Sequence, residues 1–497
     1  MSHQAHDIGK HDSAFEHHEM AVQEQKESSI NSNGEQVWDE PRFENMTVAE
    51  QKAFSSKLVR KIDLILMPTL VLIFVFNILD RSNISQARLK GLEKDLKLTD
   101  TQFDTCISIL FVGYLSFQLP SNLILTRVRP NLYLPICMVI WGTISACTAV
   151  AKNYTNLLLI RFFLGFAEAP FFSGALLILS AWYTRREMAP RIAIMYSGNT
   201  LANAFGGLLA AGILKNLEGA HGIRGWRWLF IIEGTCTVGL ALVAFFLLPN
   251  FPADTKWLSE QERRFCSWRM TVDANGEEDT KSSIGAGVLA AVTDYKVWLL
   301  VAIQLCLLTS QTYSFFFPTI VKTLGKDTTT TLLLTAPPYF AGFFTSLINS
   351  LVAAKTGKRT ILIVWPLVVA AIGDIIVIST LKTAPRYFGM FLMVIGSYSA
   401  FNVVLSWVSA TIPRPQTKRA VSLAMVNMIA NCSNIYGSYF FPSKSGPKYR
   451  SGGIALIAFA LAGAVLACVL GAILHRENKK TEALERQDGV KRYKYLI

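Results

Sequence analysis

The chain has 497 residues, of which 51% are hydrophobic and 17% are charged. Soluble domains usually carry about 25% charged residues, so the apolar excess indicates a surface that faces lipid. The net charge of +13 comes from short Lys and Arg clusters between apolar runs rather than from a continuous basic face, which argues against a nucleic-acid partner. The eight cysteines lack metal-ligand spacing and mostly lie in apolar runs, so we expect free thiols and no metal site.

The amino-terminal segment is polar. Residues 1–50 contain no apolar core of the roughly 7–15 residues that a cleavable signal peptide needs. The first spanning helix is therefore expected to act as its own signal. Residues 1–60, rich in Glu, Gln, Ser and His, are predicted to form a disordered cytoplasmic tail.

Apolar stretches long enough to cross a bilayer recur along the rest of the chain. A helix needs about 20 residues to span ~30 Å of hydrocarbon, and its own hydrogen bonds satisfy the backbone there. The predicted spans lie near residues 62–83, 103–125, 132–151, 156–182, 191–214, 226–249, 295–320, 330–354, 360–379, 388–410, 419–440 and 452–474. Pro337 and Pro338 are expected to break the eighth span locally. The sequence thus predicts an all-α membrane protein with twelve transmembrane helices.

The spans divide into two groups of six. An N-terminal half, residues 61–249, and a C-terminal half, residues 295–475, are joined by a linker at 250–294 and followed by a cytoplasmic tail at 476–497. The linker segment WLSEQERRF suits a short amphipathic helix at the membrane surface, with a flexible stretch after it around 275–278. Two six-helix halves with one long connection are typical of transporters that bind their substrate between the halves.

The distribution of basic residues predicts the orientation. Loops 127–129, 185–191, 355–359 and 414–419 are dense in Lys and Arg, as is the segment just before the first span. Basic loops remain on the cytoplasmic side. An even number of spans then places both termini in the cytoplasm.

Four ionisable residues inside predicted spans require an explanation, because each costs at least ~2.5–3.5 kcal/mol to insert. Arg161 and Glu168 lie seven residues apart in the fourth span, which is two helical turns and one face. Asp80 and Arg81 end the apolar part of the first span. They either mark where that helix meets water or, if it continues to Ala87, face the same cavity as the other two.

The second alternative suits an anion carrier coupled to protons. A guanidinium stays charged and offers forked donors to a carboxylate, whereas burial raises the pKa of a carboxylic acid towards neutrality. We therefore expect Arg81 and Arg161 to bind the substrate. Asp80 and Glu168 are expected to carry the proton.

Uncharged polar residues mark the predicted C-terminal half. Asn427, Asn431 and Asn434 form one helical stripe in the eleventh span, which suits either cavity lining or hydrogen bonding between helices. Asn427 and Asn431, together with Tyr313 in the seventh span, complete the predicted substrate-binding set. Asp374, in the ninth span, is expected to be structural.

Several segments in this order resemble one known family. They are LDRSNISQA, SFQLPSNLIL, RFFLGFAEAPFFSG, AWYTRREMAPRIA, GWRWLFIIEG, LPNFPADTKWLSEQERR, TAPPY, TKRAVSLAMVNMIAN and YFFPSKSGPKYRSGG. Together they resemble the anion:cation symporter branch of the major facilitator superfamily, in particular its fungal allantoate-permease-like group. The resemblance covers about residues 60–475 and implies a rocker-switch fold that imports carboxylates, such as allantoate, nicotinate or pantothenate, with protons. It also places Asp80, Arg81, Arg161 and Glu168 at the family's substrate and proton-coupling positions.

These observations predict a proton-coupled symporter of a small organic anion, working by alternating access in a fungal plasma membrane. The proton gradient is the energy source, so we expect no cofactor and no enzymatic activity. The expected partners are the anion, protons and the lipid bilayer, and the chain is expected to be monomeric. Two alternatives remain open: an exporter of a metabolite or toxin from the same superfamily, and a nutrient receptor that binds without transport.

Overall fold

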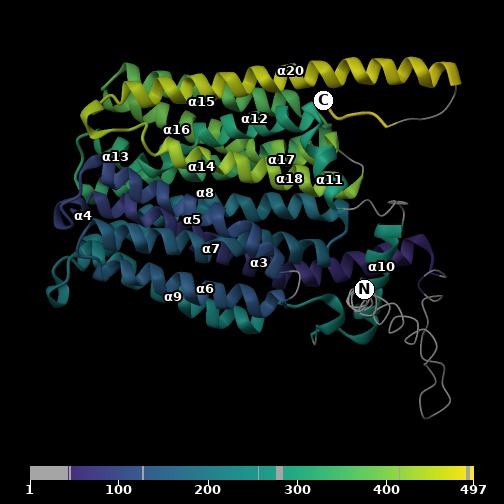
Figure 1. The fold of residues 1–497 in the computed structure, drawn as a ribbon, viewed down its shortest axis with the longest axis horizontal. Helices are drawn as coiled ribbons and strands as arrows, with labels where there is room; N and C mark the ends of the chain where they lie inside the picture. The colour runs from purple at the N-terminus through teal and green to yellow at the C-terminus, as the bar shows by residue number, and fades with distance from the viewer. Residues whose placement is uncertain are drawn as a thin grey trace, which may run out of the picture.

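A computed structural model describes residue 43 and residues 46–125, 128–255, 257–275, 284–412, 415–488 and 493–497. Throughout these ranges the regular structure is helical, as the sequence predicts. Figure 1 shows the long helices side by side along the longest axis of the molecule, the earlier ones (purple to teal) below the later ones (green to yellow).

The first layer holds six long helices. They are α3 (Val48–Arg88), α5 (Asp100–Leu125), α6 (Pro130–Cys147), α7 (Tyr154–Trp182), α8 (Arg185–Asn216) and α9 (Gly225–Leu247). The short α4 (Leu92–Asp95) follows α3, and the 3-10 turns η1 (Thr148–Val150), η2 (Ala220–Gly222) and η3 (Pro252–Asp254) lie in connections. The connection to the second layer carries α10 (Glu260–Asn275) and α11 (Ile284–Val292).

The second layer contains more interrupted helices. Its elements are α12 (Tyr295–Ser310), η4 (Thr312–Phe315), α13 (Phe317–Lys322), α14 (Thr328–Thr356), α15 (Thr360–Ser379), α16 (Thr383–Ser399), α17 (Phe401–Thr411), α18 (Gln416–Asn431), α19 (Ser433–Gly437), η5 (Ser443–Ser445) and α20 (Arg450–Asp488). We call the end of the bundle near α10 and α11 the linker end. The end near α4 and α13 is the far end (Figure 1).

The outer surface of the bundle is apolar. In the described residues, ten helical segments are long and apolar enough to cross a membrane. Large hydrophobic side chains on them point outward: Phe246 is 90% exposed, Leu64 73% and Val465 61%. Such a surface is unfavourable in water and favourable in lipid. The chain is therefore an integral, multi-pass membrane protein, while the count of twelve spans stays a prediction, because α8 and the 16-residue α18 are not among the ten.

The helix breaks do not lie where the sequence predicts them. The expected break at Pro337 and Pro338 is wrong, since α14 continues through both. Helices in membranes tolerate proline where neighbouring helices support the backbone, and α14 packs closely along α8. The breaks fall instead at Gln311, between α12 and η4, and at Ala400, between α16 and α17.

Helix α3 begins earlier than predicted. Its cap is Thr47, whose hydroxyl accepts a hydrogen bond from the Glu50 amide while the Glu50 carboxylate accepts one from the Thr47 amide. Residues 48–60, assigned to the disordered tail, are therefore helical. Beyond them Asp63 pairs with Arg191 of α8 at 2.6 Å, which secures the linker-end portion of α3.

The last described residues return to the linker end of the second layer. The Trp407 indole donates to the Leu496 carbonyl at 2.9 Å, and the Arg359 amide donates to the Ile497 carbonyl at 2.7 Å. Asn478 of α20 exchanges two hydrogen bonds with the Tyr495 backbone, each of 2.8 Å. The expected amphipathic helix in the linker is present as α10, and the flexible stretch expected after Asn275 lies outside the described residues.

The two layers touch at both ends of the bundle. At the far end, the Arg88 guanidinium donates to Ser443 Oγ at 3.0 Å, and Ser443 Oγ donates to the Asp100 carboxylate at 2.7 Å. Towards the linker end, the rings of Tyr196 and Phe401 stack with centroids 3.5 Å apart. Between these contacts the layers enclose a central space.

Candidate functional site

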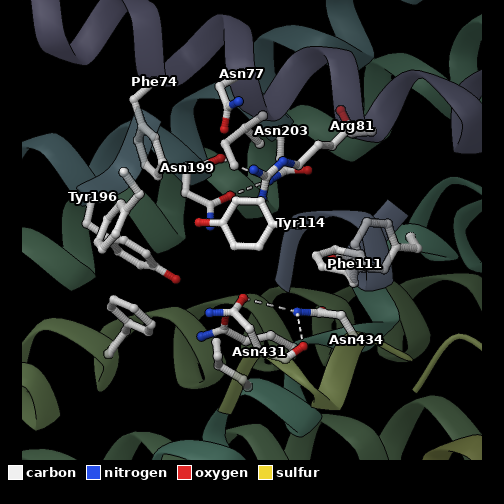
Figure 2. Close-up of a pocket in the computed structure, with 18 of the residues that line it drawn as sticks. Phe74, Asn77, Arg81, Phe111, Tyr114, Tyr196, Asn199, Asn203, Asn431 and Asn434 are labelled. Atoms are coloured by element: carbon white, nitrogen blue, oxygen red, sulfur yellow. Dashed lines mark hydrogen bonds between the residues drawn. The ribbon is translucent and has the colours of Figure 1, made fainter. Parts of the chain in front are cut away.

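A cavity of about 120 Å³ lies between the two layers. A single water needs roughly 10–15 Å³ on this measure, so the space suits a small molecule of several heavy atoms. Its polar lining from the first layer is Asn77, Arg81, Ser82, Tyr114, Tyr196, Asn199 and Asn203, and from the second Gln311, Ser314, Tyr398, Asn427, Asn431 and Asn434. Phenylalanines from both layers cover much of the remaining wall. Figure 2 shows first-layer side chains on one side of the cavity and the Asn431–Asn434 pair on the other.

Arg81 is the charged residue of this lining. Its Nε donates to Glu168 Oε2 at 2.5 Å, and its guanidinium lies 4.7 Å from the centroid of the Tyr114 ring. Helix α3 continues for two turns beyond it, to Arg88, so the alternative in which the first span meets water at Asp80 is excluded. An arginine in an apolar, amide-lined cavity offers charged hydrogen-bond donors that are chemically suited to an anion.

Glu168 lies behind Arg81. It comes from the middle of α7, its side chain is fully buried, and Oε1 has no hydrogen-bond partner among the described residues. The ion pair with Arg81 is therefore the main interaction that offsets the free-energy cost of burying the Glu168 carboxylate. Any molecule that draws Arg81 away leaves this carboxylate without a partner.

Asp80 faces away from the cavity. Its two carboxylate oxygens accept hydrogen bonds from Ser145 of α6, at 2.6 Å, and from Thr237 of α9, at 2.9 Å. The adjacent Arg81 points into the cavity because neighbouring residues on a helix face different directions. Asp80 thus connects α3 to the back of its own layer.

Arg161 is also behind the wall. It is 1% exposed, and it donates to the carbonyls of Arg81 at 3.0 Å, Asp80 at 3.4 Å and Cys106 at 3.4 Å. The four charged residues form one connected group, as expected, but the expectation that all four face the cavity does not hold in this conformation. The donors of Arg161 are directed at the backbone of α3 and α5.

The asparagine stripe of the eleventh span does line the cavity. Asn431 Nδ2 donates to the Asn427 carbonyl at 2.8 Å, and Asn434 Nδ2 donates to the Asn431 carbonyl at 3.3 Å. These bonds run along α18 and into α19, so they orient the amides without engaging another helix. The sequence left two alternatives for this stripe, cavity lining or hydrogen bonding between helices, and the structure shows cavity lining.

Tyr313 does not reach the cavity. Its hydroxyl pairs with Ser397 Oγ at 2.8 Å, and its ring, 1% exposed, packs against Phe317. The break after α12 turns Tyr313 into the core of the second layer. The neighbouring Gln311 and Ser314 line the cavity in its place.

A second asparagine pair escaped the sequence analysis. Asn203 Nδ2 donates to the Asn199 carbonyl at 2.9 Å, which repeats on α8 the arrangement of Asn431 and Asn427 on α18. The signal was present as two asparagines four residues apart in an otherwise apolar stretch. Glu233 of α9 is another buried group that was missed.

The comparisons with known proteins agree with this architecture. A model of the Major Facilitator Superfamily matches residues 70–438, more than half of the chain. The MFS-type transporter cnsO of Penicillium expansum is 32% identical over 91% of this chain and 90% of its own length. The high-affinity nicotinic acid transporter of Saccharomyces cerevisiae is 29% identical over 86% of this chain and 79% of its own.

Solved structures share the fold. The proton:xylose symporter XylE superimposes with a TM-score of 0.61 at 13% identity, covering 82% of this chain and 95% of its own. An inward-facing bacterial homologue of the lysosomal transporter Spinster gives 0.60 at 16% identity, covering 82% and 94%. With the helical bundle, the lipid-facing surface and the central cavity, these matches confirm the expected superfamily. The chain belongs to the Major Facilitator Superfamily and is a membrane transporter.

Proposed function

We propose that this chain is a proton-coupled symporter of a small carboxylate. The observation that carries the proposal is the Arg81–Glu168 ion pair at the wall of an otherwise uncharged cavity. A carboxylate substrate and Glu168 compete for the same guanidinium. Because the single positive charge of Arg81 neutralises only one buried carboxylate, binding of the substrate is linked to neutralisation of Glu168.

This competition supplies the coupling. Protonation of Glu168 on the side of higher proton concentration frees Arg81 to bind the substrate carboxylate. After the cavity opens to the other side, Glu168 loses its proton and recovers Arg81, which expels the substrate. Binding of a proton to Glu168 thereby gives the cavity a high affinity for the substrate on one side of the membrane, and loss of the proton gives it a low affinity on the other. Alternating access requires such a difference between its two states.

The other predicted residues support this pair. Arg161, bound to the carbonyls of Asp80 and Arg81, holds the α3 backbone where Arg81 enters the cavity, and it contacts substrate in a rearranged state. Asp80, held by two hydroxyls, is a second proton acceptor. Asn427 and Asn431 bind the uncharged part of the substrate.

We further propose that the linker end faces the cytoplasm, that twelve helices span the bilayer, and that the chain works in the plasma membrane of a fungus. The density of basic residues in the linker-end loops supports this orientation. The resemblance to the anion:cation symporter branch, and the nicotinic acid transporter among the relatives, support a carboxylate as the substrate.

A panel experiment tests the function. Purified protein in liposomes is given labelled nicotinate, pantothenate or allantoate, with and without an inward proton gradient. We expect one of them to accumulate only with the gradient. Arg81→Lys should abolish that uptake, whereas Arg224→Lys, at a half-exposed loop residue outside the cavity, should not. Uptake that needs an outward gradient would instead indicate an exporter, and saturable binding without counterflow would indicate a receptor.

A further inference from the structure

Glu233 is a buried acid that the proposed cycle does not use. It lies two turns into α9 and is 2% exposed. Neither carboxyl oxygen has a hydrogen-bond partner among the described residues. A buried polar group normally finds such a partner, so this side chain needs a reason to be retained.

Its surroundings contain no compensating cation. The charged side chain that faces Glu233 is Asp80 of α3, and the polar neighbour is Asn83, whose two amide atoms also lack partners in the part of the chain that the structure describes. Helix α6 and η1, which pack against α9, carry no Asp, Glu, His, Lys or Arg. The charged residues of α8 are confined to its two ends, and Arg227 of α9 itself donates to the Ala149 carbonyl.

Two adjacent carboxylates cannot both be ionised here. Like charges in a medium of low dielectric constant repel strongly, and no described cation offsets that repulsion at Glu233. Asp80 accepts two hydroxyl hydrogens, which is the arrangement of an ionised acid, whereas Glu233 accepts none. Of the two acids, Glu233 therefore has the weaker support for a negative charge, and it lies outside the cavity lining.

We propose that Glu233 is a third proton-exchanging carboxyl, which passes its proton to Asp80 during transport. In this step, after Asp80 leaves one of its hydroxyl partners, one O–H bond of Glu233 breaks and one forms on the freed Asp80 oxygen. Asp80 then releases the proton to water on the side of lower proton concentration, and Glu233 takes up another from the side of higher proton concentration. Neutralising Asp80 alters the α3 segment whose carbonyls Arg161 holds, so the transfer reaches Arg81 through the backbone. The inference rests on the proposed function and adds to it a second proton per substrate, separate from the proton on Glu168.

The experiment measures the electric charge that moves across the membrane with each substrate molecule. Proteoliposomes containing wild-type protein or Glu233→Gln receive the labelled carboxylate that the wild type accumulates, and a potassium diffusion potential sets the membrane voltage. The voltage that halts net flux gives the charge moved per substrate. We expect Glu233→Gln to move one elementary charge fewer than the wild type while counterflow without a gradient is retained. Equal values for the two proteins would overturn the inference.

Matched variants separate this role from a structural one. Asp374→Asn makes the same acid-to-amide change at a side chain that is also 2% exposed, in the second layer, and should leave the charge per substrate unaltered. Glu233→Asp should restore the wild-type value, because it keeps an exchangeable proton. A result in which all three variants lose the same charge would contradict the assignment.

A second readout does not depend on the substrate. Infrared difference spectra between acidic and alkaline samples should show bands of buried protonated carboxyl groups, and one band of the wild type, that of Glu233, should be missing in Glu233→Gln. If the wild type accumulates none of the carboxylates, the proposed function fails, and this band still decides the state of Glu233. A band that persists in the variant would show that the proton resides elsewhere.

Discussion

At the scale of single residues, the proposed function gives Arg81 two successive partners: Glu168 and the carboxylate of the substrate. Its Nε lies 2.5 Å from the Glu168 carboxylate, yet the same guanidinium is 13% exposed to the cavity. In the proposed cycle, Arg81 binds the substrate carboxylate when Glu168 is neutral. The proposed coupling therefore depends on two side chains of the same layer.

Replacing Glu168 with Gln should separate exchange from accumulation. Glutamine resembles the protonated acid permanently, so Arg81 remains free for the substrate in both orientations of the cavity. We expect counterflow without a gradient to continue and gradient-driven accumulation to fall to the equilibrium level. Proteoliposome uptake with and without an inward proton gradient measures both. Wild-type accumulation in the variant would remove Glu168 from the coupling mechanism.

Arg161→Lys should weaken substrate binding far more than it lowers the amount of protein in the membrane. Lysine keeps the charge but cannot direct planar donors to three carbonyls at once, so the α3 backbone under Arg81 loses its support. We expect about tenfold weaker binding, or ~1.4 kcal/mol. Scintillation proximity binding, normalised to the quantity of purified protein, checks it. Unchanged affinity would show that the carbonyl contacts do not position the site.

At the scale of the helix, the fifth spans of the two halves are related. Helices α8 and α18 each present two asparagines four residues apart, and in each the second amide donates to the carbonyl of the first. Both pairs line the cavity from opposite layers. These helices are also the two predicted spans that are not among the ten segments long and apolar enough to cross a membrane.

Asn431→Ala should change which carboxylate is preferred without changing proton coupling. The side chain belongs to the uncharged wall of the cavity, so its loss removes contacts to the body of the substrate and leaves the Arg81 pair intact. We expect affinities within the panel to shift about tenfold relative to one another. Met428→Ala, on an exposed face of the same helix, is the control and should have no such effect. A uniform loss for all substrates would instead indicate a folding defect.

Element positions could be predicted better than element breaks. Apolar length located the spans because lipid imposes a minimum of about 20 residues, and the cost of burying charge identified Asp80, Arg81, Arg161 and Glu168 as one group. The breaks at Gln311 and Ala400 depend on packing between helices, which a single sequence does not display. Proline, the local signal that was used, is outweighed by support from α8.

The direction in which each side chain points could not be predicted from the sequence either. Asp80 and Arg81 are neighbours in the chain, and one faces α6 and α9 while the other faces the cavity. Glu233 lies two turns inside its predicted span, and its burial follows from the packing of α9 on α3 and α6. Tertiary contacts decide such cases.

Across the whole molecule, the two layers touch at the far end and again towards the linker end, with the cavity lined by residues of both layers. At the far end the contact is polar, with Arg88 of the first layer donating to Ser443 of the second at 3.0 Å. Arg88 also pairs with Glu93 of its own layer at 2.9 Å. Towards the linker end the contact is the aromatic stack of Tyr196 on Phe401. Alternating access requires that the contacts at one end of the cavity separate while those at the other end stay in place.

Arg88→Ala should favour an open far end. The substitution removes the guanidinium that links α3 to the turn at Ser443, so the closed state loses a partly buried charge-assisted contact. In a background without native cysteines, Asn434→Cys should react with an impermeant maleimide several times faster when Arg88 is absent. Arg224→Ala, at a loop position within the first layer, is the control. Equal labelling rates would show that Arg88 does not hold the layers together.

Acid should reinforce the closed far end through Glu93. Burial raises the pKa of Glu93 above its usual range, against the opposing effect of Arg88, with Asp100 adding to the rise. If opening exposes Glu93, its pKa returns to the usual range, so the closed state binds the proton more tightly and gains stability as pH falls through the raised pKa. The labelling rate at position 434 should drop on acidification, and Glu93→Gln should remove that part of the pH dependence. A rate that rises with acid in both proteins would contradict it.

The proposed topology can be checked on intact cells. Tags attached at Met1 and Ile497 should both resist external protease, because basic loops at the linker end favour the cytoplasm. Permeabilised cells provide the control for cleavage. Cleavage of either tag in intact cells would require a different number of spans.

The charged group of the site belongs entirely to the first layer, while the cavity wall from the second layer carries amides, hydroxyls and aromatic rings. In the proposed function, proton coupling therefore depends on the first half of the polypeptide, and the second half contributes to the choice of substrate. Mutations in α12, α17 and α18 can change the cargo while the proton-coupling residues stay intact. A chimera that joins residues 1–249 of this chain to the second half of a relative should acquire the relative's substrate range and retain the proton stoichiometry of this chain.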